Sequence, residues 1–257
     1  MAKHRMRAAA AIALLSVPGA AGAQEATTMF WVYQEHVRPA MVAEYEDATR
    51  DLVGLFESAG EAAASVSWTT ISSMETGYFF AIPIEGFGGI DETWQAWMGA
   101  VEAAGRENFD RIDERVNESL DRASSFVIAL RPDLSYLPET VSLDSELPYR
   151  KYYWWYITPG LEEEFESAAK SFIDLYRSHG IETGWRLYQF VMGDDMPAYL
   201  VVDRAAGPYE YEARDRETME KLGAEAQALG ARAMKTARRM EITDGWVRPE
   251  LSFPQGR

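Results

Sequence analysis

An internal repeat constrains the fold of this 257-residue chain more than any other feature of the sequence. From Tyr33 to Trp68, many positions are followed by a similar residue 120 positions later, ending at Tyr188. The segment 131–136, Arg-Pro-Asp-Leu-Ser-Tyr, returns as Arg-Pro-Glu-Leu-Ser-Phe at 248–253. The sequence therefore encodes two related units of about 110 residues, each long enough to be a domain.

Hydrophobic periodicity predicts the same order of elements in both units, β–α–β–β–α–β. Aromatic and β-branched runs predict strands, and apolar residues three and four positions apart predict helices that bury one face. Pro39 and Pro159 favour the start of the first helix of each unit, and Gly60 and Gly180 favour its end. The predicted strands are 29–37, 65–72, 77–83 and 125–130, then 149–157, 184–192, 198–203 and 241–247.

The second helix of each unit is predicted to be long. Apolar residues at helical spacing run from Trp94 to Leu120 in the first unit and from Met219 to Ala237 in the second. These residues share one helix face, which we expect to pack on the sheet.

This order is that of a ferredoxin-like unit, an α+β fold whose antiparallel four-stranded sheet carries both helices on one face. The other face would be exposed, although the strand residues 152–156, Tyr-Tyr-Trp-Trp-Tyr, are apolar on both faces. Such exposure costs about 1.5–3 kcal/mol for each side chain. We therefore predict that the two sheets pack on each other as an intrachain α+β barrel. The predicted boundaries are a first repeat at 24–136, a linker at 137–148 and a second repeat at 149–257.

Two short segments carry a family resemblance. In the second unit the strand end 156–160, Tyr-Ile-Thr-Pro-Gly, precedes the acidic helix start 161–165, Leu-Glu-Glu-Glu-Phe, and the first unit has a degenerate counterpart at 36–46. These segments resemble the dimeric α+β barrel superfamily, which includes the antibiotic-biosynthesis-monooxygenase-like and stress-responsive barrel families. The resemblance implies a barrel formed by two fused units without a second subunit. It also implies either a cofactor-free oxygenase of electron-rich aromatic substrates or a haem-using relative.

The first 23 residues have the layout of a secretory signal peptide. A basic start with Lys3, Arg5 and Arg7 precedes an apolar run at 8–17 and a small-residue ending at 21–23. The apolar run is shorter than the ~20 residues that span a bilayer. We expect cleavage near Ala23 and a soluble periplasmic or secreted protein without a membrane span.

Charge and composition exclude several classes of function. The formal net charge of −16 argues against nucleic acid as a partner, because nucleic-acid binding needs a basic surface. The chain has no Cys and only three His, so it offers no thiolate or multi-histidine metal site. Asp194 and Asp195 lie in a predicted hairpin turn, and two adjacent acids do not supply the roughly six to eight oxygen ligands of calcium. We predict no metal centre.

Aromatic residues with polar tips are dense on the predicted central strands. They are typical both of a filled core between the sheets and of a small-molecule cavity with a few polar anchors. In the strands of the second unit, the odd-numbered and the even-numbered residues are both largely apolar, so either set could face the interior. The candidate ligand-binding residues are Trp154, Tyr156, Arg186, Tyr188 and Trp68.

The first strands of the two units differ most at 34–36, where Gln-Glu-His stands in place of the Trp-Trp-Tyr at 154–156. Glu35 and His36 point to opposite faces of a strand and therefore do not form a side-by-side acid–base pair. They are the catalytic candidates, although no complete catalytic constellation surrounds them. His36 could act as a general base. If the chain uses haem, the axial ligand could be His36 or a Tyr. The alternative is a structural histidine bonded to backbone or solvent.

Residues alike in both units are expected to hold the fold. We interpret Arg131 and Arg248 as guanidinium groups that bond a neighbouring carboxylate or carbonyl, the alternative being a pair of anion-binding arginines. His179, beside Gly180 at a helix end, is interpreted as a contact with the helix dipole.

Three classes of function remain. The first is the binding of a small apolar or aromatic molecule between the two sheets. The second is an enzyme of the kind that the resemblance implies, with or without haem. The third is an envelope protein that interacts through its surface and has a filled core. The protein would be a monomeric pseudo-dimer or a homo-oligomer.

Overall fold

The second unit follows the predicted order of elements, and the first unit differs only in that two helices precede its last strand. The computed structural model describes residues 28–73, 76–138 and 147–254. The first unit contains β1 (Met29–Val37), α1 (Val42–Ser58), β2 (Thr69–Ser73), β3 (Gly77–Ile84), α2 (Gly88–Ala104), α3 (Arg106–Ser119) and β4 (Leu120–Leu130). The second unit contains β5 (Tyr149–Ile157), α4 (Glu162–Ser178), β6 (Arg186–Met192), β7 (Ala198–Ala205), α5 (Pro208–Met234) and β8 (Ala237–Val247).

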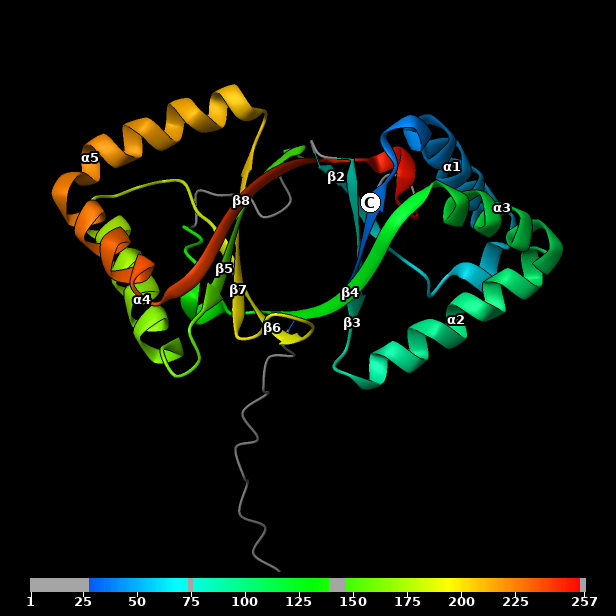
Figure 1. The fold of residues 1–257 in the computed structure, drawn as a ribbon, viewed down its shortest axis with the longest axis horizontal. Coiled ribbons are helices and arrows are strands. Elements are labelled where there is room, and N and C mark those ends of the chain that lie inside the picture. Colours follow the sequence, from blue (N-terminus) through cyan, green and yellow to red (C-terminus); the bar gives the residue numbers. More distant parts are fainter. Residues whose placement is uncertain (1–27, 74–75, 139–146, 255–257) are drawn as a thin grey trace, which may run out of the picture.

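The eight strands form one closed antiparallel barrel in the order β1-β3-β2-β8-β5-β7-β6-β4. The pairs β2–β8 and β4–β6 join the two units edge to edge. Figure 1 shows α1, α2 and α3 on one side of the barrel and α4 and α5 on the other. The predicted α+β fold, with two tandem ferredoxin-like units that form an intrachain α+β barrel, is confirmed.

Some sequence predictions fall outside the described residues. The predicted signal peptide at 1–23 and positions 139–146 of the predicted linker are among them. Cleavage near Ala23 and the boundaries of the two repeats therefore stay predictions. Within the described part of the chain, no helix combines the length and apolarity that a membrane crossing requires.

The single second helix predicted for the first unit is in fact two helices. The helix breaks at Gly105, whose φ of +102° is outside the helical region, so that α2 and α3 are separate. Gly223 interrupts α5 in the same way, with φ +58° and ψ −137°. Leu120 and Ala237, which fit the helical stripes, instead begin β4 and β8. Glycine allows both breaks because it has no Cβ to clash at positive φ.

Alternation along the strands separates an inner core from outer ones. On β1, Val32 faces the barrel interior with Phe126 and Trp154, whereas Met29 packs toward the helices. The barrel interior is therefore built from both units, while each outer core belongs mainly to one sheet and its helices. This arrangement places potential sites on both faces of the first sheet.

Two arginines related by the repeat connect the units. Arg131 at the end of the first unit donates to Glu166 on α4 at 2.7 Å and 2.9 Å. Arg248 at the end of the second unit donates to Glu46 on α1 at 2.6 Å and 2.9 Å. The interpretation that both arginines bond carboxylates is confirmed, and the repeat explains why both sequence copies keep the motif.

Candidate functional site

A cavity of about 240 Å³ lies between the inner faces of the two sheets, and we call it the barrel cavity. Aromatic rings from both units form much of its wall, including Phe79 and Phe126, which pack against Trp154. An apolar cavity of roughly 150 Å³ binds benzene, so this one accommodates a single substituted ring. Three candidate ligand-binding residues, Trp154, Arg186 and Tyr188, line it together.

Tyr156, another candidate, faces the interior but lies outside the wall of the barrel cavity. The guanidinium of Arg239 covers its ring, with Cζ 3.8 Å from the ring centroid. Trp154 is fixed by a hydrogen bond from its Nε1 to Thr243 Oγ1 at 2.8 Å. The inner set on β5 is therefore the even-numbered one, which the sequence left open.

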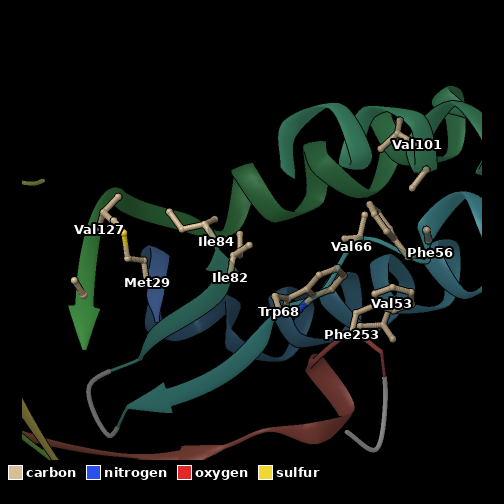
Figure 2. Close-up of a cluster of buried hydrophobic side chains, with 13 residues drawn as sticks. Met29, Val53, Phe56, Val66, Trp68, Ile82, Ile84, Val101, Val127 and Phe253 are labelled. Carbon is tan, nitrogen blue, oxygen red and sulfur yellow. The ribbon is translucent and has the colours of Figure 1, made fainter. Parts of the chain in front are cut away.

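Trp68 is separated from the other four candidates. It pairs with Phe253 as an isolated bridge, and Trp185 pairs with Tyr136 in the same way, so the counterpart of Trp68 is Trp185 rather than Tyr188. This shift in register places Trp68 on the outer face of the sheet. Figure 2 shows it beside Phe253 and Val53, in the cluster between the strands and the helices.

Sequence reasoning did not select Arg150 and Arg204, which lie with Arg186 in the wall of the barrel cavity. They occupy neighbouring positions on β5 and β7. The repeat contains a signal for Arg150, because Arg150 stands 120 positions after Phe30, where an aromatic residue would be expected.

A second cavity, of about 250 Å³, lies between the first sheet and its helices, and we call it the first-unit cavity. Its aromatic wall combines strand and helix residues, and two carboxylates interrupt it. The lining residues are Trp31, Tyr33, Glu35, Tyr45, Thr49, Leu52, Trp68, Phe80, Ile82, Thr93, Trp94, Trp97, Phe109, Ile112, Asp113 and Val116.

Glu35 is held in this cavity by a hydrogen bond from Tyr45. The Tyr45 hydroxyl donates to Glu35 Oε2 at 2.5 Å, and Thr49 Oγ1 donates to the backbone oxygen of Tyr45 at 2.8 Å. Tyr45 and Thr49 lie on α1 and are buried. Because Glu35 is an odd-numbered residue of β1, strand alternation directs it toward the helices.

Burial raises the pKa of the Glu35 carboxyl, and the negative charge of Asp113 raises it further, while the Tyr45 hydrogen bond opposes the rise. Burial and the Glu35 charge in turn raise the pKa of Tyr45 well above its ordinary value, so its hydroxyl stays a donor. A carboxylate with a raised pKa is a stronger base than a solvated one.

His36 lies on the opposite face of β1 from Glu35, as strand alternation predicts. Its Nε2 is 3.0 Å from Gln34 Nε2 and 3.4 Å from Arg122 Nη2. His36 therefore does not line the first-unit cavity, and the two catalytic candidates are not brought together.

The second unit differs from the first at the position of Glu35. Trp155 stands there and packs against Phe165 of α4, with ring centroids 5.4 Å apart. In the first unit the corresponding pair is Glu35 and Tyr45, which are joined by a hydrogen bond. The carboxylate is therefore specific to one of two otherwise similar units.

Haem fits the first-unit cavity poorly. The described lining contains no His to act as an axial ligand and no Lys or Arg to pair with propionates. Its charged groups, Glu35 and Asp113, are both acidic and would repel those propionates. The tyrosines of the cavity have raised pKa values, which disfavours tyrosinate as a ligand. We derive no haem chemistry from this site.

Two other candidates have structural roles. The His179 ring contacts the backbone oxygen of Leu175, with Nδ1 at 3.0 Å, at the end of α4. Asp195 accepts from Arg239 at 2.7 Å and also contacts Arg238, in the turn between β6 and β7. In the part of the chain that the structure describes, no group of three metal-ligating side chains occurs.

No protein-family model and no curated protein matches this sequence. Solved structures share its fold. An anthrone oxidase-like protein aligns with a TM-score of 0.57 at 10% identity, over 88% of this chain and 92% of that chain. A monooxygenase-like protein of Fusobacterium nucleatum subsp. nucleatum aligns with 0.55 at 12% identity, over 87% and 93%. A chlorite dismutase variant from Candidatus Nitrospira defluvii aligns with 0.52 at 12% identity, over 87% and 92%. The chain therefore has the dimeric α+β barrel fold, in a tandem fused form.

Proposed function

We propose that this protein binds a small hydroxylated aromatic molecule in the first-unit cavity, and that Glu35 accepts the hydrogen bond or the proton of its hydroxyl group. One observation carries the proposal: a partly buried carboxylate lies in a cavity whose other walls are mostly aromatic. A carboxylate in such surroundings is unfavourable unless a donor pairs with it. Tyr45 supplies one donor, and a ligand hydroxyl would supply another.

The wall selects the chemistry of the ligand. Trp31, Trp94 and Trp97 offer ring faces for an aromatic molecule, and the volume of about 250 Å³ suits one ring. Two acidic groups disfavour an anionic ligand at the same place. A neutral phenol satisfies both constraints, because it is aromatic and donates to the carboxylate.

Catalysis is a second candidate function, and the raised pKa of Glu35 favours it. A general base is most effective when its pKa is near the operating pH. The resemblance to cofactor-free oxygenases implies molecular oxygen as the oxidant. The step that we assign to this chain is removal of a proton from the bound aromatic molecule by Glu35, with Tyr45 keeping the carboxylate in place.

The experiment compares 4-cresol with p-xylene, in which a methyl group of similar size replaces the hydroxyl, by calorimetric titration of the protein. We expect 4-cresol to bind about 10- to 150-fold more tightly, since a hydrogen bond to a charged group contributes about 1.5–3 kcal/mol. Glu35→Gln should remove most of this preference. Leu52→Phe, which introduces the side chain of the second unit at this position, should fill the cavity and weaken both ligands.

Arg186→Gln is the matched control, because Arg186 lines the other cavity. It should leave the binding of 4-cresol unchanged. If Leu52→Phe and Glu35→Gln bind both compounds as the wild type does, the proposed site is wrong. Oxygen uptake with 4-cresol, lost in Glu35→Gln, would support the catalytic candidate, and a Soret band in the purified protein would support a haem-using enzyme instead.

Two further sequence hypotheses bear on this function. Binding between the two sheets stays a proposal for the barrel cavity, whose arginines require a ligand of different chemistry. The presence of two cavities argues against a filled core. Export is also a proposal, and the N-terminal residue of the protein recovered from the cell envelope or medium tests it.

A further inference from the structure

We infer that the barrel cavity is a second binding site, for a small aromatic carboxylate, in which Arg150 and Arg186 hold the carboxylate and the aromatic wall holds the ring. The site lies on the opposite face of the first sheet from Glu35 and shares no lining residue with the first-unit cavity. It therefore does not depend on the proposed function.

The arginines of the barrel cavity come from the second unit alone. In the paired registers, Arg150 and Arg204 on β5 and β7 stand where Phe30 and Pro83 stand on β1 and β3. The equivalence of Trp68 and Trp185 likewise places Arg186 where the first unit has Thr69. Three positions that the fold fills with uncharged residues in one unit therefore carry guanidinium groups in the other.

These arginines differ from those that join the units. Arg131 and Arg248 each bond two carboxylates. Within the part of the chain that the structure describes, the hydrogen bonds of Arg150 go to the backbone oxygens of Leu147 and Tyr149. No carboxylate in the described ranges forms an ion pair with Arg150 or Arg186, whereas Arg204 does have an interaction partner.

Among the described residues, Arg150 and Arg186 therefore have no carboxylate partner. Burial and the positive charge of Arg186 both lower the pKa of Arg150, as expected for a guanidinium without an acidic neighbour. A partly buried cation is stabilised when an anion pairs with it. Arg204 lies in the same wall.

The remaining wall restricts which anion fits. Beyond the arginines and Thr69, the cavity is lined by aliphatic side chains and by six aromatic ones, Phe30, Phe79, Phe126, Tyr152, Trp154 and Tyr188. An inorganic anion would leave this apolar surface unused, whereas an aromatic ring would cover it. A carboxylate also matches the planar fork of a guanidinium. One ring with a short carboxylate arm is consistent with a volume of about 240 Å³.

The test is calorimetric titration of the full chain with phenylacetate and, in parallel, with the neutral phenylacetamide. We expect phenylacetate to bind and phenylacetamide to bind at least about 10-fold more weakly. Arg150→Gln and Arg186→Gln should each weaken phenylacetate about 10- to 100-fold, the effect of losing a charge-assisted hydrogen bond. They should change the binding of phenylacetamide less than about 3-fold.

Arg122→Gln is the control, because Arg122 lies beside His36 on β4 and does not line the cavity. It should bind phenylacetate as the wild type does. If Arg122→Gln loses as much phenylacetate binding as Arg186→Gln does, the proposed site is wrong. It is also wrong if the wild type does not bind phenylacetate. Competition by inorganic phosphate as strong as that by phenylacetate would also overturn it in favour of a simple anion site. Glu35→Gln should leave phenylacetate binding intact, which separates this outcome from that of the first-unit cavity.

Discussion

Single residues distinguish the two units on the outer faces of the sheets. Asp203 on β7 occupies the position that Ile82 occupies on β3, as the registers of both strand pairs show. Burial raises the pKa of Asp203 to about 7, and Asp215 adds to the rise, while Arg214 opposes it from 3.9 Å. A carboxyl group thus replaces an apolar side chain, and the ion pair with Arg214 does not offset its burial.

Asp203 makes the stability of the protein fall as pH rises. Its pKa is higher in the folded than in the unfolded chain, so its stabilising contribution is present below the unfolded value and is lost as pH rises through about 7. We predict that Asp203→Asn gains stability relative to the wild type by about 2 kcal/mol between about pH 5.5 and pH 8, then levels off. Urea unfolding at several pH values measures this difference.

Asp174→Asn is the control for this prediction, because Asp174 is exposed on α4. Its stability difference from the wild type should stay nearly constant over the same pH range. A constant difference for Asp203→Asn as well would mean that Asp203 titrates normally in the folded protein.

The residue scale also shows why the site was only partly predictable. Glu35 stands out in the sequence because Trp155 replaces it in the repeat, yet the cavity around it depends on α2 and α3, which cover the sheet from a distant segment. Arg150 differs from Phe30 at the same offset, but its inward direction follows from strand pairing rather than from local pattern. Asymmetry between repeats therefore identifies candidates, and tertiary packing decides which cavity they line.

At the scale of elements, strands were predicted more closely than long helices. The bounds of β1 and β5 agree with the prediction, because turn residues and prolines limit each aromatic run. The helical stripe of the first unit continues through Gly105 on both sides, so its periodicity conceals the break. The shift that separates Trp68 from Tyr188 arises because the loops before β2 and β6 differ in length.

Gly105 should be required for the angle between α2 and α3. Its φ of +102° is strained for any residue with a Cβ, and an added Cβ would lie 3.4 Å from Asn108 Nδ2. We predict that Gly105→Ala lowers the free energy of unfolding by about 1–2 kcal/mol. Gly99→Ala, inside α2 with no atom within 4 Å of the added Cβ, should instead be neutral or gain about 0.5–1 kcal/mol. Equal effects of the two substitutions in thermal unfolding would show that the break tolerates a side chain.

At the scale of the whole molecule, each unit completes the other. The sheets close only through β2–β8 and β4–β6, and the segments after β4 and β8 each reach the first helix of the opposite unit. Trp68 Nε1 donates to Leu251 O at 2.8 Å, and Trp185 Nε1 donates to Leu134 O at 3.3 Å, which repeats the exchange at a second pair of sites. One chain thus supplies all eight strands of the barrel, and its two units should unfold together.

The two arginine–glutamate pairs between the units make this cooperativity testable. Arg131 and Arg248 hold the pKa values of Glu166 and Glu46 below their ordinary range, so the stability that they contribute is present near neutral pH and is lost as pH falls through the folded values. We predict that Arg131→Gln and Arg248→Gln each cost about 1–3 kcal/mol near pH 7 and progressively less below about pH 4. Arg177→Gln, which removes an exposed pair on α4, should cost less than about 0.5 kcal/mol.

Far-UV circular dichroism and tryptophan fluorescence should report one common transition for every variant, because a barrel closed across both units cannot lose one of them and keep the other. Two separate transitions in Arg131→Gln or Arg248→Gln would show instead that the units are stable independently and that the ion pairs only dock them.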